Sequence, residues 1–173
     1  DNKAQSKTFY LSSLLFADDA LFMGQSADHL RSLLDSFNAW CNKWRMVISV
    51  PKSKVIALND AAPPAFSIPG RGVMENVKEF KYLGVWFTAD GKWDNDLSKK
   101  IARFEGACAR AHKTLTLRFL SLWDRTRIWT ALCRPVLEYA SELINVPHDS
   151  PMWRKMRSAQ VGSLKKILGA PRS

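Results

Sequence analysis

The hydrophobic pattern of this chain begins with two short apolar runs on either side of a pair of acidic residues. Residues 9–17 and 20–24 are rich in hydrophobic side chains, and Asp18 with Asp19 lies between them. Each run is too short for a helix of ordinary length. The pattern therefore predicts two buried strands that meet at a tight Asp-Asp turn.

A helical pattern follows this hairpin. Apolar residues recur at spacings of three and four from Leu30 to Trp44, after the cap and first-turn candidates Ser26 and Asp28. This spacing predicts one amphipathic helix that covers one face of a sheet. Cys41 lies on its apolar face, where we expect a buried packing thiol rather than a nucleophile.

The next stretch has the pattern of short strands. The β-branched residues predict strands at 47–50 and 55–58 around a Pro-Lys-Ser-Lys connection, and 59–72, rich in Pro and Gly, reads as a loop or linker. Residues 80–87 form a further strand run that contains Gly84, and an Asp-Gly turn signal follows it. We expect a hairpin here.

From residue 94 the period becomes helical. Apolar positions predict helices at 94–115, at 121–143 with a kink at Pro135, and at 151–168. Ser121 and Asp124 have the spacing of a capping box. The chain therefore predicts an α+β fold whose second half is mainly helical.

Charge divides the chain in the same way. Residues 1–91 carry ten Lys or Arg against nine Asp or Glu, whereas 92–173 carry sixteen against seven, within an overall formal charge of +10. A polyanion is the natural partner of such a surface, because neutralised phosphates release counterions. A basic face kept only for solubility is the alternative.

Composition indicates a folded domain rather than a disordered tail, with 46% hydrophobic residues in 173. No apolar run reaches the length of a membrane helix, and the three cysteines are widely spaced. We expect an intracellular protein of a reducing compartment, without resolving nucleus, cytoplasm or organelle. Because the chain begins with Asp1 rather than Met, we expect a fragment, a processed product or an incomplete protein.

Four landmarks in this chain resemble those of one enzyme family. Phe16-Ala17-Asp18-Asp19 looks like the acidic box of reverse transcriptases, specifically those of non-LTR (LINE-type) retrotransposons. Residues 44–54 are similar to the Lys-Ser/Thr motif that follows it, 80–85 resemble the family's Tyr-Leu-Gly primer-grip hairpin, and 159–169 resemble a helix near the end of such regions. The landmarks stand in the family's order and cover nearly the whole chain.

The resemblance implies part of a polymerase palm, with a β-hairpin, a helix and a small antiparallel sheet, followed by a helical thumb-like region. On this interpretation residues 1–91 are the partial palm and 92–173 the basic thumb-like region. The hairpin at Tyr82, Leu83 and Gly84 would position the primer end. Without the resemblance, a core hairpin that touches no ligand is an equal alternative.

The resemblance also assigns catalytic roles. Asp18 and Asp19 would supply part of a site for Mg²⁺ or Mn²⁺, with Asp18 the stronger ligand, and Lys52 would lie near the phosphates of the nucleotide. From the residues alone, the aspartates could merely cap a turn and Lys52 could lie in a solvated turn. The family usually has Gly and Asn where this chain has Arg45 and Ser49, and its other metal-binding aspartate lies upstream of the box.

The basic residues of the second half provide candidates for contact with phosphates. Four of them fall within a narrow arc of the helix at 94–115, opposite its apolar side. Others belong to the last helix, which has no acidic residue. The predicted nucleic-acid-binding set is Lys99, Arg103, Arg110, Lys113, Arg154, Lys155, Arg157, Lys165 and Lys166.

Two functions remain open at this point. The chain is either a piece of an RNA-directed DNA polymerase that binds RNA or an RNA/DNA duplex and is inactive until the upstream part completes it, or a reverse-transcriptase-derived RNA-binding subunit of a large ribonucleoprotein such as a ribosome. The missing upstream segment or other ribonucleoprotein subunits are the partners expected in each case. Whether the chain by itself is an enzyme stays open.

Overall fold

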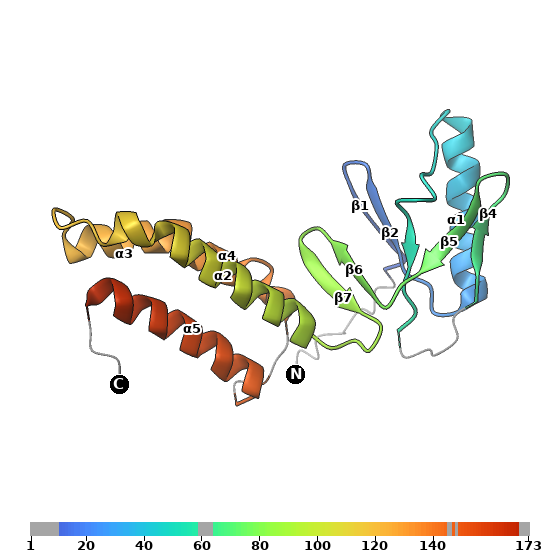
Figure 1. Ribbon diagram of the computed structural model, residues 1–173. Coiled ribbons are helices and arrows are strands. Elements are labelled where there is room, and N and C mark those ends of the chain that lie inside the picture. The colour runs from blue at the N-terminus through green and yellow to red at the C-terminus, as the bar shows by residue number, and fades with distance from the viewer. Residues whose placement is uncertain (1–10, 59–63, 145–146, 148, 170–173) are drawn as a thin grey trace, which may run out of the picture. The chain divides into compact units, whose positions relative to one another are not determined.

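The computed structural model describes residues 11–58, 64–144, 147 and 149–169. The chain forms two compact units, Asp1–Val77 and Lys78–Ser173, whose elements are shown in Figure 1. Both contain helices, and the strands form small separate sheets, so the fold mixes α and β structure. The compact units divide fourteen residues before the predicted boundary between 91 and 92, because the hairpin at 79–88 packs with the helices that follow it.

The first unit begins with the predicted hairpin. Strands β1 (Ser13–Phe16) and β2 (Asp19–Phe22) pair antiparallel, with Phe16 opposite Asp19. The turn therefore consists of Ala17 and Asp18, and Asp19 already belongs to β2. The prediction of two buried strands is wrong. Every residue of β1 is exposed, and Leu15 retains 71% of its accessible surface, whereas β2 has two exposed and two half-buried residues. Nothing in the described part of this unit covers β1.

Helix α1 (Ala27–Lys43) follows as predicted. The Ser26 side chain caps it by accepting a hydrogen bond from the His29 amide at 3.1 Å. Phe37 of this helix packs against Phe22 of β2, with ring centroids 4.8 Å apart. Cys41 is buried, as expected of a packing thiol, and its burial raises the pKa of the thiol.

A three-stranded sheet completes this unit. Strand β5 (Gly72–Asn76) lies between β3 (Lys54–Val55), which is parallel to it, and β4 (Phe66–Ile68), which is antiparallel. Helix α1 packs against β4, and the core consists of Val50, Val55, Phe66, Ile68 and Met74.

Two predictions for this region are wrong. The predicted linker at 59–72 contains β4, in which Phe66 and Ile68 alternate with exposed Ser67; its part at 59–63 lies outside the described residues. Prolines on both sides of β4 indicated a loop, and the alternation of apolar and polar residues between them is too short to indicate a strand. The predicted strand at 47–50 is irregular, although Val50 is still buried in the core, and the strand predicted at 55–58 is reduced to β3. Burial of β-branched residues does not require a strand.

The second unit begins with a tight hairpin. Strands β6 (Glu79–Tyr82) and β7 (Val85–Thr88) pair antiparallel, which confirms a hairpin, but its turn interrupts the predicted strand run at 80–87 instead of lying at the Asp-Gly signal after it. Leu83 and Gly84 form the turn with φ of 44° and 84°, the positive pair that matches the twist of two-residue hairpins. The Tyr139 hydroxyl donates a hydrogen bond to the Leu83 carbonyl at 2.6 Å. This bond joins the turn to a residue 56 positions later.

Four helices and a 3-10 turn follow the hairpin. They are α2 (Asp94–Leu115), α3 (Leu122–Leu132), α4 (Arg134–Glu138), η1 (Ser141–Leu143) and α5 (Pro151–Leu168). The predicted helices at 94–115 and 151–168 and the capping box of Ser121 and Asp124 are confirmed.

The single kinked helix predicted at 121–143 is wrong. Helix α3 ends at Leu132, and Pro135 lies in the first turn of α4, where its missing amide hydrogen is not needed. Ala140, with φ of 54°, then separates α4 from η1. Proline here begins a new helix instead of bending an old one.

The core of this unit lies between α2 and the later helices. Phe104 and Trp129 pack edge to face, and the Trp129 indole donates a hydrogen bond to the Ser163 hydroxyl at 3.1 Å. Cys133 is fully buried in the same core. The pKa of Cys133 is raised to about 12, mainly by burial and to a smaller extent by the neighbouring Cys108 thiol. The Cys133 thiol is therefore neutral and packs as an apolar group.

A buried ion pair lies within α2, and its carboxylate is also bonded to the hairpin. Asp96 and Lys100, one helical turn apart, are 0% and 1% exposed, and their charged atoms lie 2.9 Å apart. The other Asp96 oxygen accepts a hydrogen bond from the Trp86 amide of β7 at 2.9 Å. One carboxylate thus fixes the start of α2 against a strand.

We predict that Lys100→Met destabilises the 173-residue chain by about 3 to 5 kcal/mol, because it leaves the Asp96 carboxylate buried without its counter-ion. Chemical denaturation followed by circular dichroism measures this change. Lys113→Met is the matched control, since Lys113 is an exposed lysine of the same helix and makes no ion pair among the described residues. Equal stabilities of the two variants would refute the assigned role of the pair.

Gly84→Ala should destabilise the second unit more than Gly91→Ala does. Both glycines have positive φ, so alanine costs about 1 to 2 kcal/mol at either position. Only at Gly84 would the new Cβ lie 3.0 Å from a Tyr139 ring carbon, whereas at Gly91 it would meet no atom within 4 Å. Denaturant midpoints compare the two variants, and a smaller loss at Gly84 would show that the Tyr139 contact is unimportant.

Candidate catalytic turn and nucleic-acid interface

The β1–β2 turn presents both acidic residues to solvent. Asp18 is the second residue of the turn, Asp19 begins β2, and both are exposed. Ala17 precedes them with φ of 52°, in the left-handed region that costs a residue with a Cβ about 1 to 2 kcal/mol. A positive φ is common in two-residue hairpin turns. The conformation of Ala17 therefore belongs to the turn that presents Asp18 and Asp19.

These carboxylates fit part of a metal site. Mg²⁺ is commonly bound through one or two carboxylates, with water and substrate phosphate oxygens as the other ligands. Asp18 and Asp19 offer adjacent carboxylates in such a number. The described residues contain no group of three or more His, Cys, Asp or Glu side chains that could hold a metal ion. The pair therefore suits an ion that substrate oxygens and other carboxylates also bind.

Lys52 lies on a separate turn between α1 and β3. The Lys52 and Ser53 amides both donate to the Ser49 carbonyl, at 3.1 Å and 3.0 Å, and the Lys52 side chain is exposed. Among the described residues no hydrogen bond or ion pair joins Lys52 to Asp18 or Asp19. The structure thus forms a defined turn at Lys52 without bringing this lysine into direct contact with the aspartates.

Arg45 keeps the backbone conformation that glycine favours. This chain has Arg45 where the resembled family usually has Gly, and its φ is 57°. A residue with a Cβ therefore occupies a left-handed position. The replacement changes the side chain and adds strain, but it preserves a bend that glycine would make easily.

The predicted primer-grip residues form the β6–β7 turn. Tyr82 is half-buried, Leu83 is exposed, and Gly84 has the positive φ that the turn requires. The carbonyl of Leu83 is already bound to the Tyr139 hydroxyl. The turn is held by its own unit, and the Leu83 side chain is the part of it that is open to a ligand.

Of the four nucleic-acid-binding residues predicted on α2, one lysine is packed against the protein and three cationic side chains are exposed. The Lys99 ammonium lies 3.3 Å from the centre of the Trp86 ring and 3.0 Å from a Glu79 oxygen. Hydrogen bonds from Lys99 and then Asn95 lower the pKa of Glu79, so this carboxylate offsets the Lys99 charge at neutral pH. Arg103, Arg110 and Lys113 are exposed and make no ion pair in the described part of the chain.

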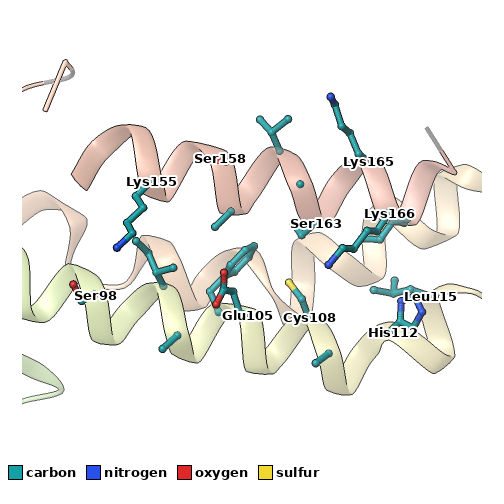
Figure 2. Close-up of a pocket in the computed structure, with 18 of the residues that line it drawn as sticks. Ser98, Glu105, Cys108, His112, Leu115, Lys155, Ser158, Ser163, Lys165 and Lys166 are labelled. Carbon is teal, nitrogen blue, oxygen red and sulfur yellow. The ribbon is translucent and has the colours of Figure 1, made fainter. Parts of the chain in front are cut away.

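The predicted set on α5 lies beside a groove. A groove of about 1470 Å³ runs between α2 and α5, and Lys155, Lys165 and Lys166 line it. Figure 2 shows Lys155 and Lys166 extending from α5 toward α2, whereas Lys165 extends away from it. Arg154 and Arg157 are exposed on the same helix. The positive charge of α5 thus borders the groove and continues onto its outer surface.

Sequence reasoning missed three residues that organise this unit. Asp96 and Lys100 have the spacing of an ordinary surface ion pair on a helix, so their burial had no local signal. Tyr139 lies in a segment with no motif, and only the tertiary fold brings its hydroxyl to the β6–β7 turn. The strain at Ala17 was equally invisible in the sequence.

One further property concerns membranes. Across the described ranges, no helix combines the length and the apolar character that crossing a bilayer requires.

Comparisons with known proteins agree on one family. Residues 3–87 match the family described as reverse transcriptase (RNA-dependent DNA polymerase). The chain is also 27% identical over 165 residues to the RNA-directed DNA polymerase from mobile element jockey of Drosophila funebris. This match covers 90% of the chain and 18% of that protein. No solved structure matches the chain. The chain thus spans about a fifth of the curated relative, and both matches support its resemblance to the reverse transcriptases of non-LTR, LINE-type retrotransposons.

Proposed function

We propose that this chain is part of an RNA-directed DNA polymerase in which the second unit binds the backbone of RNA or of an RNA/DNA duplex and the β1–β2 turn contributes to catalysis. One observation carries the binding role: Arg103, Arg110 and Lys113 are exposed cations on one side of α2, in a half-chain with sixteen basic and seven acidic residues. Unpaired cations of this kind gain free energy when phosphates displace their counterions.

The catalytic role rests on the turn. Asp18 and Asp19 would hold Mg²⁺ or Mn²⁺ together with carboxylates from the rest of the polymerase, and such a metal supplies a Lewis acid for phosphoryl transfer. Asp18, which lies in the turn, is the stronger ligand candidate by its match to the acidic box of the resembled family. The Lys52 ammonium would offset negative charge on the nucleotide phosphates.

The chain alone is proposed to be inactive. Two carboxylates are fewer than a two-metal site requires, and the chain spans 18% of its curated relative. Apolar β1 is exposed, which is unusual in a self-sufficient domain and supports a partner segment of the polymerase packing there. On this proposal the first unit is the second half of a palm, and the helices of the second unit form a thumb-like region.

The ribonucleoprotein alternative gains no support. The family match is to polymerases, and the curated relative is a polymerase of a mobile element.

Asp18→Ala should abolish polymerisation without weakening RNA binding. In a protein that joins this chain to the rest of the reverse transcriptase, we expect primer extension to fall by about 100-fold or more, because the loss of a ligand costs at least as much as the loss of its supporting residues. Binding of RNA by the 173-residue chain should stay within about twofold. Asp35→Ala, at an exposed position of α1, is the control that retains extension. Full extension by the Asp18 variant would refute the metal role.

Reversing Arg103, Arg110 and Lys113 to Glu should weaken binding of the chain to an RNA/DNA duplex and flatten its salt dependence. Each phosphate contact contributes about one to the slope of log affinity against log salt, so the slope should fall by about three. Fluorescence anisotropy across a salt series measures it.

The matched control for this triple variant reverses Lys78, Lys81 and Lys92, which are exposed lysines outside the predicted set. It changes the net charge equally while sparing the α2 surface. An equal effect of both triples would show that overall charge, rather than the α2 surface, determines binding.

A further inference from the structure

Large apolar side chains are exposed where α2 leads into α3, two of them in the connection and two in the first turn of α3. Phe119 is 80% and Trp123 70% exposed, and Leu117 and Leu122 beside them are also exposed. We call these four residues the aromatic tip. Figure 1 shows this connection at the end of α2 away from the β6–β7 hairpin of the same unit. The 22 residues of α2 span about 33 Å between them.

The backbone of the aromatic tip is held firmly although its side chains are exposed. The Arg125 guanidinium donates to the carbonyls of Leu117 at 3.0 Å and Leu120 at 3.2 Å. Ser121 and Asp124 close the capping box at the start of α3. Because the backbone of this segment is already fixed on both sides, it loses little further conformational entropy when a ligand binds to its aromatic rings.

The charges around the aromatic tip are positive and open. Arg118 and Arg127 are exposed and make no ion pair in the ranges that the structure describes. The one acidic residue between them, Asp124, is occupied by the capping box. Lys113, which we propose to bind phosphate, lies in the last turn of α2 and leads directly to this connection.

We infer that the aromatic tip binds unpaired nucleotides of a nucleic-acid strand, whose bases stack on Trp123 and Phe119 while Arg118 and Arg127 contact phosphates. Exposed aromatic rings interleaved with cations are the combination that single-stranded nucleic acid requires, because every base has a π-face and every phosphate a charge. A purely apolar partner would leave these arginines without a counter-charge. The inference rests on the proposed function in one respect, that the second unit binds nucleic acid, but it uses different residues.

The test replaces Phe119 and Trp123 together by Ala in the 173-residue chain. The probes are a 12-nucleotide single-stranded RNA that carries one 2-aminopurine and a blunt RNA/DNA duplex, each titrated across a salt series. We expect affinity for the single strand to fall by about tenfold or more and the quenching of 2-aminopurine to disappear. The salt slope should not change, because no charge is removed. Affinity for the duplex should stay within about twofold.

Two controls accompany this variant. Trp123→Phe with Phe119→Tyr keeps both rings and should retain single-strand binding. Trp44→Ala removes another exposed tryptophan, in the first unit, and should have no effect. Because both replaced side chains of the tip are mostly exposed, the melting temperature should be unchanged.

The outcomes separate the two proposals. The role of the aromatic tip is overturned if the alanine variant still binds the single strand as tightly as the parent chain does. It is also overturned if the variant loses affinity equally for the duplex and the single strand. In both cases salt-sensitive binding by the parent chain leaves the proposed function standing. Loss of self-association in sedimentation, without any change in single-strand binding, assigns the tip to a second copy of the chain and overturns the inference as well. Absence of binding by the parent chain to either probe at low salt contradicts both.

Discussion

The buried pair of Asp96 and Lys100 is the interaction on which the second unit depends. Transfer of two charges from water into a protein interior is costly, and only close pairing with further hydrogen bonding offsets it. The structure provides a 2.9 Å ion pair and a bond from the Trp86 amide to the same carboxylate. The ion pair lies within α2, and the Trp86 bond reaches from its carboxylate to β7, so separation of the hairpin from the helix would break a hydrogen bond to a buried charge.

This arrangement also determines where the proposed nucleic-acid surface begins. Lys99 and Lys100 are neighbours in the sequence, but one packs over the Trp86 ring and the other is buried. Both charges have carboxylate partners in the hairpin and the first turns of α2. The open cations of α2 therefore start at Arg103, and the interface extends toward the far end of the helix.

The candidate catalytic turn shows how local sequence and strain combine. The apolar runs around Asp18 and Asp19 were enough to predict a hairpin, since its strands are short and its pairing is local. The sequence could not reveal that Ala17 is left-handed or that β1 remains exposed. Burial of a strand depends on the segment that packs against it, and the residues of the strand do not identify that segment.

The sequence by itself determined the features that depend on neighbours along the chain. Helix caps at Ser26 and Ser121 and the start of α5 at Pro151 all follow from side chains within four residues of one another. The resemblance to reverse transcriptases could be recognised in the same way, because the motifs that carry it are short and stand in order along the chain.

Only the tertiary structure decided the features that join distant residues. It placed Phe66 and Ile68 in a core strand rather than a linker, brought Tyr139 to the Leu83 carbonyl, and buried Lys100 instead of exposing it. Each of these outcomes depends on whether a distant partner removes water from a side chain. Spacing along the sequence specifies which side chains share a face, whereas the free energy of desolvation depends on what the fold places against that face.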